Sequence, residues 1–270
     1  MSAVKQLVKR ASVAVDRVAP PKPGVTVLIY HRVGGGSDSA VDLPAETFEA
    51  QLAHLREHHR VLTLDAAIDE LSVAPTDAVA PAVVLTFDDG TADFTDVAVP
   101  LLARYEIPAT LYAATSFIDE GALFPWGAPP TSWAALREAC STGFVTVGSH
   151  THTHRLLDRL PAAEVAVDLD RSIERIGTEI GRAPEHFAYP KAVPPSPVAE
   201  IEVRRRFRSA TLAGGKVNRP GRVDLLRLGR TPIQTTDTAD QFAAKAAGGF
   251  RLEGAARAAV AAVRYRGMET

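Results

Sequence analysis

Residues 82–91 read AVVLTFDDGT, an apolar run that passes directly into two carboxylates and a glycine. The abundance of Val, Leu and Phe predicts a buried β-strand over Ala82–Phe87. Neighbouring side chains at the end of a strand point to different sides, so Asp88 and Asp89 can take different roles, one binding a metal and the other taking up protons. An ordinary turn rich in Asp and Gly is the alternative interpretation.

Short apolar runs alternate with amphipathic helical segments on both sides of this strand. The other predicted strands are Val25–Tyr30, Ala109–Ala113, Phe144–Val147, His186–Tyr189, Ser209–Leu212 and Leu228–Ile233. The predicted helices are Ala45–His59, Leu64–Leu71, Val97–Tyr105, Trp133–Cys140, Pro161–Ile180, Val198–Phe207 and Glu253–Tyr265. Strands that alternate with helices predict a parallel α/β fold. We expect a single domain whose polar turns lie at the C-terminal ends of the strands, where barrel enzymes carry their catalytic residues.

A second polar cluster is rich in histidine. Residues 148–154 read GSHTHTH. On a helical turn, His150 and His154 lie on one face with their Cβ atoms about 5–6 Å apart, which suits two imidazoles on one metal ion. His152 points away in such a turn and is interpreted as a supporting or structural residue. The alternative is a solvated, histidine-rich loop.

Two histidines and one carboxylate form a ligand set that leaves positions open for water and substrate. A divalent cation in such a site acidifies water and polarises a carbonyl group. A second carboxylate beside it serves as the general base. This combination favours hydrolysis of an amide or an ester.

These residues resemble the polysaccharide deacetylases of carbohydrate esterase family 4, the NodB-like family. The resemblance rests on LTFDDGTADFTDVAVPLLARYEIPATLYAATSFI at 85–118, on GSHTHTHRLL at 148–157, and on HFAYP at 186–190. It extends from about Val25 to Ile233. It implies a distorted (β/α) barrel of about seven strands and the removal of N-acetyl groups from an amino sugar or N-acetylated glycan.

The resemblance also implies roles for individual residues. Asp88 corresponds to the base, and Asp89, His150 and His154 correspond to the ligands of one divalent metal ion. Zinc is the first expectation for that ion, with cobalt, nickel or iron as alternatives. The backbone N–H of Lys191 lies where the family polarises the acetyl oxygen.

Aromatic residues near these motifs are candidates for contact with the substrate. Tyr189, in the third motif, is one, and Trp126 is another because its ring lies in a Pro-rich loop and aromatic faces stack on sugars. Trp133 heads a predicted helix and is expected in the core.

The third motif departs from the family at Ala188, where many members carry Arg, and at Lys191 and Ala192, which replace Tyr and Gly. The family's D-x-x-D-W segment and its late histidine, which protonates the leaving amine, are also not apparent. His31, in the pair Tyr30-His31, is a candidate to replace this late histidine. A subgroup of the family that resembles the poly-N-acetylglucosamine deacetylases carries Tyr-His at the same place. The first and last strands of a closed barrel are neighbours, which brings His31 within reach of the site. A capping histidine is the alternative.

Arg230, at the end of a late strand, is a candidate to orient Asp88 in place of the missing Arg. The alternative interpretation is a surface arginine.

Residues 1–23 form a separate N-terminal segment in this interpretation, and residues 24–270 form the catalytic domain. Residues 4–18 place valines and a leucine on one helical face, and prolines at 20, 21 and 23 follow as a stiff spacer. Weak contact of residues 1–18 with a membrane surface is one expectation, and docking of a short helix on its own domain is the other. Neither a standard signal peptide nor a run of about 20 apolar residues is present, which predicts a cytoplasmic or peripheral protein.

The bulk composition narrows the class of partner. A net charge of −2 and a pI near 6.5 argue against binding of nucleic acid and favour a neutral or weakly charged substrate. One cysteine, Cys140, rules out an internal disulfide. The sequence leaves the oligomeric state open.

Three other functions remain open. One is a related amidase or O-acetyl esterase acting on a small, non-polymeric substrate. Another is a non-catalytic carbohydrate-binding protein on the same scaffold. A non-haem iron oxygenase uses a similar ligand triad, although the alternating strands and helices disfavour it.

Overall fold

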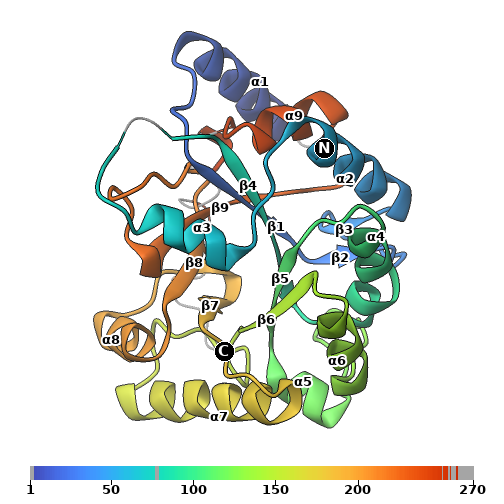
Figure 1. Cartoon of the computed structure of the whole chain (residues 1–270), viewed down its shortest axis with the longest axis vertical. Helices are drawn as coiled ribbons and strands as arrows, with labels where there is room; N and C mark the ends of the chain where they lie inside the picture. Colours follow the sequence, from blue (N-terminus) through green and yellow to red (C-terminus); the bar gives the residue numbers. More distant parts are fainter. Residues whose placement is uncertain (1–2, 77–78, 251, 255, 257–259, 261–270) are drawn as a thin grey trace.

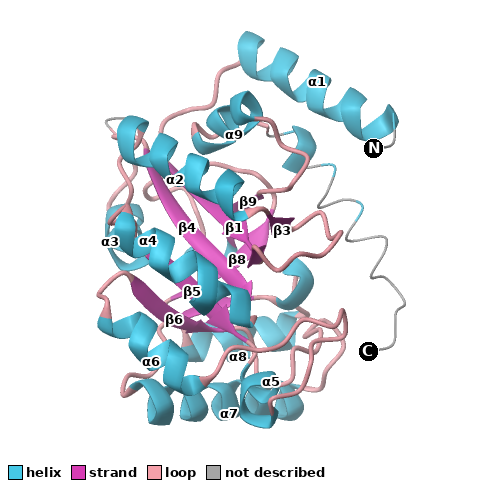
Figure 2. Cartoon of the chain, turned by 90° about the vertical axis from the view of Figure 1, so that its right-hand side faces the viewer, coloured by secondary structure: helices cyan, strands magenta, loops and turns pink. Residues whose placement is uncertain are grey.

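The computed structural model describes residues 3–76, 79–250, 252–254, 256 and 260. Within this part of the chain, seven parallel strands close into one barrel in the order β1-β4-β5-β6-β7-β8-β9 (Figures 1 and 2). The strands are β1 Val25–Tyr30, β4 Ala82–Asp89, β5 Ala109–Ala113, β6 Val145–Ser149, β7 His186–Ala188, β8 Ser209–Ala213 and β9 Leu228–Pro232. The expected barrel of about seven strands is confirmed.

Helices surround the barrel. They are α1 Ala3–Val18, α2 Ala45–His58, α3 Leu64–Leu71, α4 Val99–Arg104, α5 Thr115–Glu120, α6 Trp133–Ser141, α7 Ala162–Ile180, α8 Pro197–Arg206 and α9 Ala239–Ala246. A π-helical turn, Phe94–Ala98, precedes α4, and 3₁₀ turns cover Pro190–Ala192 and Leu225–Arg227. A small sheet pairs β2 Arg32–Val33 with β3 Asp42–Leu43. The sequence interpretation missed α5, α9 and this sheet, and the helix expected over Glu253–Tyr265 falls largely outside the described residues.

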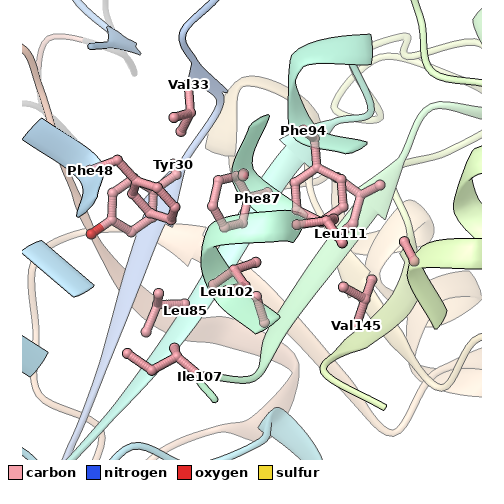
Figure 3. Close-up of a cluster of buried hydrophobic side chains, with 14 of the residues drawn as sticks. Tyr30, Val33, Phe48, Leu85, Phe87, Phe94, Leu102, Ile107, Leu111 and Val145 are labelled. Carbon is pink, nitrogen blue, oxygen red and sulfur yellow. The ribbon is translucent and has the colours of Figure 1, made fainter. Parts of the chain in front are cut away.

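The outer surface of the barrel carries the main apolar core. Strand residues that alternate along β1, β4 and β5 point outwards and pack against α2 and α4 (Figure 3). The ring of Tyr30 stacks on Phe87 with a centroid separation of 5.1 Å, and Phe48 of α2 packs edge-on against both. This layer fixes the register of the strands, because a shift by one residue would bury their polar residues against the helices.

The other residues of the same strands face the inside of the barrel. A tyrosine of β5, Tyr112, fills part of this space, and Gly148 of β6 makes room for it, since a Cβ atom at residue 148 would lie 2.7 Å from the Tyr112 ring. The guanidinium of Arg230 lies over that ring, 5.4 Å from its centroid. The interior is therefore closely packed and holds its polar groups in fixed positions.

Helix α3 closes one end of the barrel. Its apolar residues join a cluster with Val25 and Ala82, the first residues of β1 and β4. Asp65 of α3 reaches His186 at the start of β7, with Oδ1 3.1 Å from Nε2, and His186 Nδ1 lies 2.8 Å from Ser209 Oγ at the start of β8. Because the N-terminal ends of these strands are covered, the open end is the one where the strands finish.

Helix α1 packs beside α9 on the outside of the barrel (Figures 1 and 2). The Lys9 ammonium donates to Asp237 Oδ1 at 2.7 Å and to Gln241 Oε1 at 3.1 Å. Ser12, also buried, accepts a hydrogen bond from the backbone of Glu253. In the described part of the chain, no helix is both long and apolar enough to cross a bilayer.

Candidate active site

A buried charged group of the open end is Asp88, which points into the barrel from β4. Arg230 of β9 donates to both of its carboxylate oxygens, at 2.6 and 2.7 Å, and also to Thr86 Oγ1 at 3.2 Å. Burial by itself raises the pKa of Asp88, but the charge and hydrogen bonds of Arg230 oppose this effect, and the pKa lies below its ordinary value. The arrangement holds Asp88 as an oriented, ionised carboxylate.

Asp89 is the last residue of β4 and has a φ of 78°, in the left-handed region. Simple strand alternation directs its side chain out of the barrel, whereas this backbone conformation ends the strand and turns the carboxylate towards the histidines. Aspartate is among the few residues that adopt this conformation readily. Asp89 Oδ1 lies 3.6 Å from His150 Nε2 and 3.3 Å from His154 Nε2.

The segment from His150 to His154 is a loop, so the helical turn expected from the spacing is wrong. Thr151 and His154 have positive φ values of 68° and 60°, which reverse the chain soon after β6. Thr151 Oγ1 accepts a hydrogen bond from the His154 N–H at 2.8 Å and stabilises this reversal. The two imidazoles nevertheless meet, with ring centroids 4.9 Å apart.

Asp168 of α7 holds this loop in place. Its carboxylate accepts hydrogen bonds from the backbone N–H groups of His152 and Thr153, both at 3.0 Å, and from Thr153 Oγ1 at 2.6 Å. The sequence interpretation missed Asp168. Its signal is a carboxylate on the buried helix face defined by Val165 and Leu169.

His152 lies away from the other two histidines. Its Nδ1 is 2.8 Å from Thr115 Oγ1 at the start of α5. The contact ties the histidine loop to α5, which agrees with a supporting position.

Asp89, His150 and His154 fit a divalent metal ion. One ligand atom from each lies within 4.8 Å of the others, and in the described residues no other group of three His, Cys, Asp or Glu does so. His150 Nδ1–H donates to the Ala188 carbonyl at 2.8 Å, which leaves Nε2 to face Asp89 with its lone pair. Burial lowers the pKa of His150 to about 4, so the ring is neutral and able to ligate at physiological pH.

His31 lies just after β1, in a position to act on the same site. Strand β1 pairs with β4 and with β9, so His31 follows a strand that lies between those of Asp88 and Arg230. The charge of His31 contributes to the lowered pKa of both Asp88 and Asp89, after the larger effects of burial and of Arg230 at Asp88, and of burial and His154 at Asp89. The chain thus brings a partly exposed imidazole next to the two carboxylates.

The three remaining candidate residues lie in different surroundings. Lys191 follows β7 with a φ of 54°, and its Nζ lies over the Trp126 ring, 4.9 Å from the centroid. The Trp126 ring is edge-on to His154 at 6.2 Å. Tyr189 is fully buried and packs against Phe187, in a cluster with α7 and α8 on the outside of the barrel. The expected contact between Tyr189 and a substrate is therefore not supported.

Comparison with known proteins identifies the scaffold. Residues 76–205 match the sequence profile of the family described as polysaccharide deacetylase. These residues therefore form a polysaccharide deacetylase domain. This confirms the resemblance seen in the motifs at 85–118, 148–157 and 186–190. No curated protein sequence matches the chain.

Several solved structures of deacetylases are similar to this barrel. IcaB from Ammonifex degensii is 26% identical with a TM-score of 0.71, over 84% of this chain and 97% of that one. The deacetylase PplD from Streptococcus pyogenes, solved with acetate, is 20% identical with a TM-score of 0.72, over 82% and 97% of the two chains. BC0361, a polysaccharide deacetylase from Bacillus cereus, is 24% identical with a TM-score of 0.70, over 83% and 69%. The last two similarities concern the fold alone.

Proposed function

We propose that this protein hydrolyses the N-acetyl group of an amino sugar in a glycan and releases acetate. The observation that carries the proposal is the Asp88–Arg230 pair held directly beside Asp89, His150 and His154. A carboxylate fixed beside a three-ligand metal site supplies a base and an electrophile to the same carbonyl group. Tyr30-His31 at the end of β1 favours N-acetylglucosamine units as the substrate class.

The metal ion in this proposal is held by Asp89, His150 and His154. When bound, it polarises the acetamide carbonyl and acidifies water. Two imidazoles and one carboxylate suit zinc first, with cobalt, nickel or iron as alternatives. Asp168 and the Ala188 carbonyl orient the loop and the His150 ring towards it.

The residues of the chain then divide the proton transfers between them. Asp88 takes a proton from the attacking water while Arg230 keeps its carboxylate oriented. The backbone N–H of Lys191 donates to the oxygen that becomes negatively charged. His31 gives a proton to the departing amine, so that the amino sugar and acetate leave as separate products.

Substitution of Asp88 by Asn tests the proposal. We expect turnover of N-acetylated chito-oligosaccharides, measured as acetate release, to fall by about 10²- to 10⁴-fold, because the general base is lost. Metal content, measured by elemental analysis, is expected to stay unchanged, since Asp88 is not among the ligands. Asp96→Asn, which changes an exposed carboxylate shortly after the site in sequence, is the matched control. Full activity of the Asp88 variant would show that the base is misassigned.

The same assay separates the alternatives. Acetate release from acetylated xylan but not from N-acetylated sugars would favour an O-acetyl esterase, and hydrolysis of small amides alone would favour an amidase. Binding of the oligosaccharide without release of acetate would favour a carbohydrate-binding protein.

A further inference from the structure

Lys191 stands at a position where its backbone conformation is unusual. Both Lys191 and the following Ala192 have positive φ values, 54° and 53°, in the turn that follows β7. Residues with side chains adopt this region infrequently, and such conformations persist where the surroundings hold them. The turn is anchored by buried Pro190 and by the Ala192 N–H, which donates to the Tyr189 carbonyl at 2.9 Å. The direction of the Lys191 side chain is thereby constrained.

The side chain of Lys191 ends over Trp126. The Trp126 ring is stacked on Phe124 with a centroid separation of 5.0 Å and an interplanar angle of 17°, and Phe124 is stacked on Phe117 at 4.4 Å. One face of the Trp126 ring is therefore backed by Phe124, and the Lys191 ammonium lies over the ring at 4.9 Å. Such a contact favours a fixed position of the cation over the ring.

This pair lies next to the candidate metal ligands. The Trp126 ring meets His154 edge to face at 6.2 Å and is 40% exposed. Lys191 itself is exposed, and among the described residues it forms no ion pair with a carboxylate. An uncompensated positive charge is thus held beside the place where a glycan must enter to bring an acetamide to Asp89, His150 and His154.

We propose that the Lys191 ammonium, held over Trp126, acts as a charge filter on the glycan. It favours chains in which the sugar next to the reacting unit is N-acetylated or carries an acidic group, and it disfavours chains in which that sugar carries a protonated amine. The proposal rests on the proposed deacetylase function. Because each turnover creates a new amine, a modified stretch becomes a poorer substrate, and the products carry spaced rather than consecutive free amines.

The size of the effect follows from the distance between charges and from the solvent. Two like charges a few ångströms apart at an exposed site repel each other weakly, and salt screens the repulsion. We expect about a 3- to 10-fold preference in kcat/KM for a fully N-acetylated oligomer over the same oligomer with one free amine beside the reacting unit. The preference is expected to shrink at high ionic strength and at alkaline pH, where the sugar amine loses its proton.

The test compares this ratio of kcat/KM values within each variant. Lys191→Arg keeps the positive charge, Lys191→Gln removes it, and Lys22→Gln removes an exposed charge elsewhere as the matched control. We expect the wild-type ratio in the Lys191→Arg and Lys22→Gln variants and a ratio near 1 in Lys191→Gln. Because the ratio is taken within one protein, a general loss of activity at position 191 does not affect it. An unchanged ratio in Lys191→Gln overturns the proposal.

A binding experiment distinguishes failure of the charge-filter proposal from failure of the proposed deacetylase function. Affinities of the two oligomers for the Asp88→Asn protein, with and without Lys191→Gln, are measured by calorimetry, which needs no turnover. Absence of acetate release from any oligomer would contradict the proposed function alone. Equal affinities for the two oligomers in the protein that keeps Lys191 would contradict the filter.

Discussion

At the scale of single residues, the protonation of Asp88 depends on Arg230. The guanidinium donates to both carboxylate oxygens, and it is the nearest of the charges that lower the pKa of this carboxyl group. A lysine at 230 keeps a charge but loses the planar fork that binds a carboxylate through two parallel hydrogen bonds.

We therefore expect Arg230→Lys to raise the pKa of Asp88 towards its ordinary value. The acidic limb of the kcat/KM profile should move to higher pH, because the base is ionised only above its pKa. The profile is recorded between mildly acidic and alkaline pH, with Arg56→Lys, at an exposed ion pair with Glu106, as the control. A limb that does not move would argue that Asp88 is not the titrating base.

Asp168 allows a second prediction, because it acts on a metal ligand without belonging to the ligand set. Asp168→Asn weakens the three hydrogen bonds that hold the loop before His154, and substitutions of this kind lower metal affinity by about 10- to 100-fold. Titration of the metal-free protein against a competing chelator measures the affinity. Asp170→Asn, on the same helix but at an exposed ion pair with Arg206, should bind the metal as the wild type does. Equal metal affinities of the Asp168→Asn and Asp170→Asn proteins would show that Asp168 does not support the metal site.

At the scale of elements, α3 depends on a buried histidine. Burial lowers the pKa of His186 from 6.5, and the nearby Asp65 opposes this effect only in part. Between about pH 6.5 and the lower pKa of the folded protein, the unfolded chain takes up a proton that the folded chain does not. The free energy of unfolding therefore rises with pH in this window and falls as the pH drops through it.

The substitution His186→Asn should reduce the dependence of the free energy of unfolding on pH. The slope attributable to one histidine is at most about 1.4 kcal/mol per pH unit, and the variant is expected to lose up to that amount. Urea denaturation of the metal-free wild type and variant at a series of pH values gives the two slopes. Identical slopes would mean that His186 titrates alike in the folded and unfolded chains.

The elements were largely predictable because period-2 and helical apolar patterns follow burial. All seven barrel strands lie where the apolar runs predicted them, apart from shifts of one or two residues at their ends. The motif alone does not predict that the side chain of Tyr189 lies outside the barrel. Ala188 faces the interior, next to His150, and the side chain of the following residue therefore points outwards. The apolar pattern does not predict the positive φ values of Asp89 and His154, although aspartate adopts this region readily and Thr151 stabilises the chain reversal at His154.

At the scale of the whole molecule, α1 is attached through a buried cluster of charges. Asp237 is shared by Lys9 of α1 and Lys245 of α9, at 2.7 and 2.8 Å. The docked face of α1 thus carries Lys9 and Ser12, while Val15 and Val18 are exposed. The separation of residues 1–23 from a catalytic domain at 24–270, and contact of residues 1–18 with a membrane surface, both stay predictions.

Lys9→Met tests the attachment. The variant keeps the length of the side chain but removes charged hydrogen bonds to Asp237, and we expect the free energy of unfolding to fall by about 1–3 kcal/mol. Urea denaturation measures the change, with Lys22→Gln as the control for loss of an exposed lysine. Stability equal to that of wild type would indicate that the ion pair of Lys9 with Asp237 contributes nothing to the fold.

Closure of the barrel between β1 and β9 also has a consequence for biosynthesis. Asp88 leaves the ribosome long before Arg230, so the nascent barrel carries a carboxylate whose counter-charge has not yet been translated. Enclosing an unmatched anion is strongly unfavourable. We therefore expect chains that terminate before β9 to keep the barrel open between β1 and the missing strand, where cellular proteases can cleave them. Only a polypeptide that includes β9 can close the barrel.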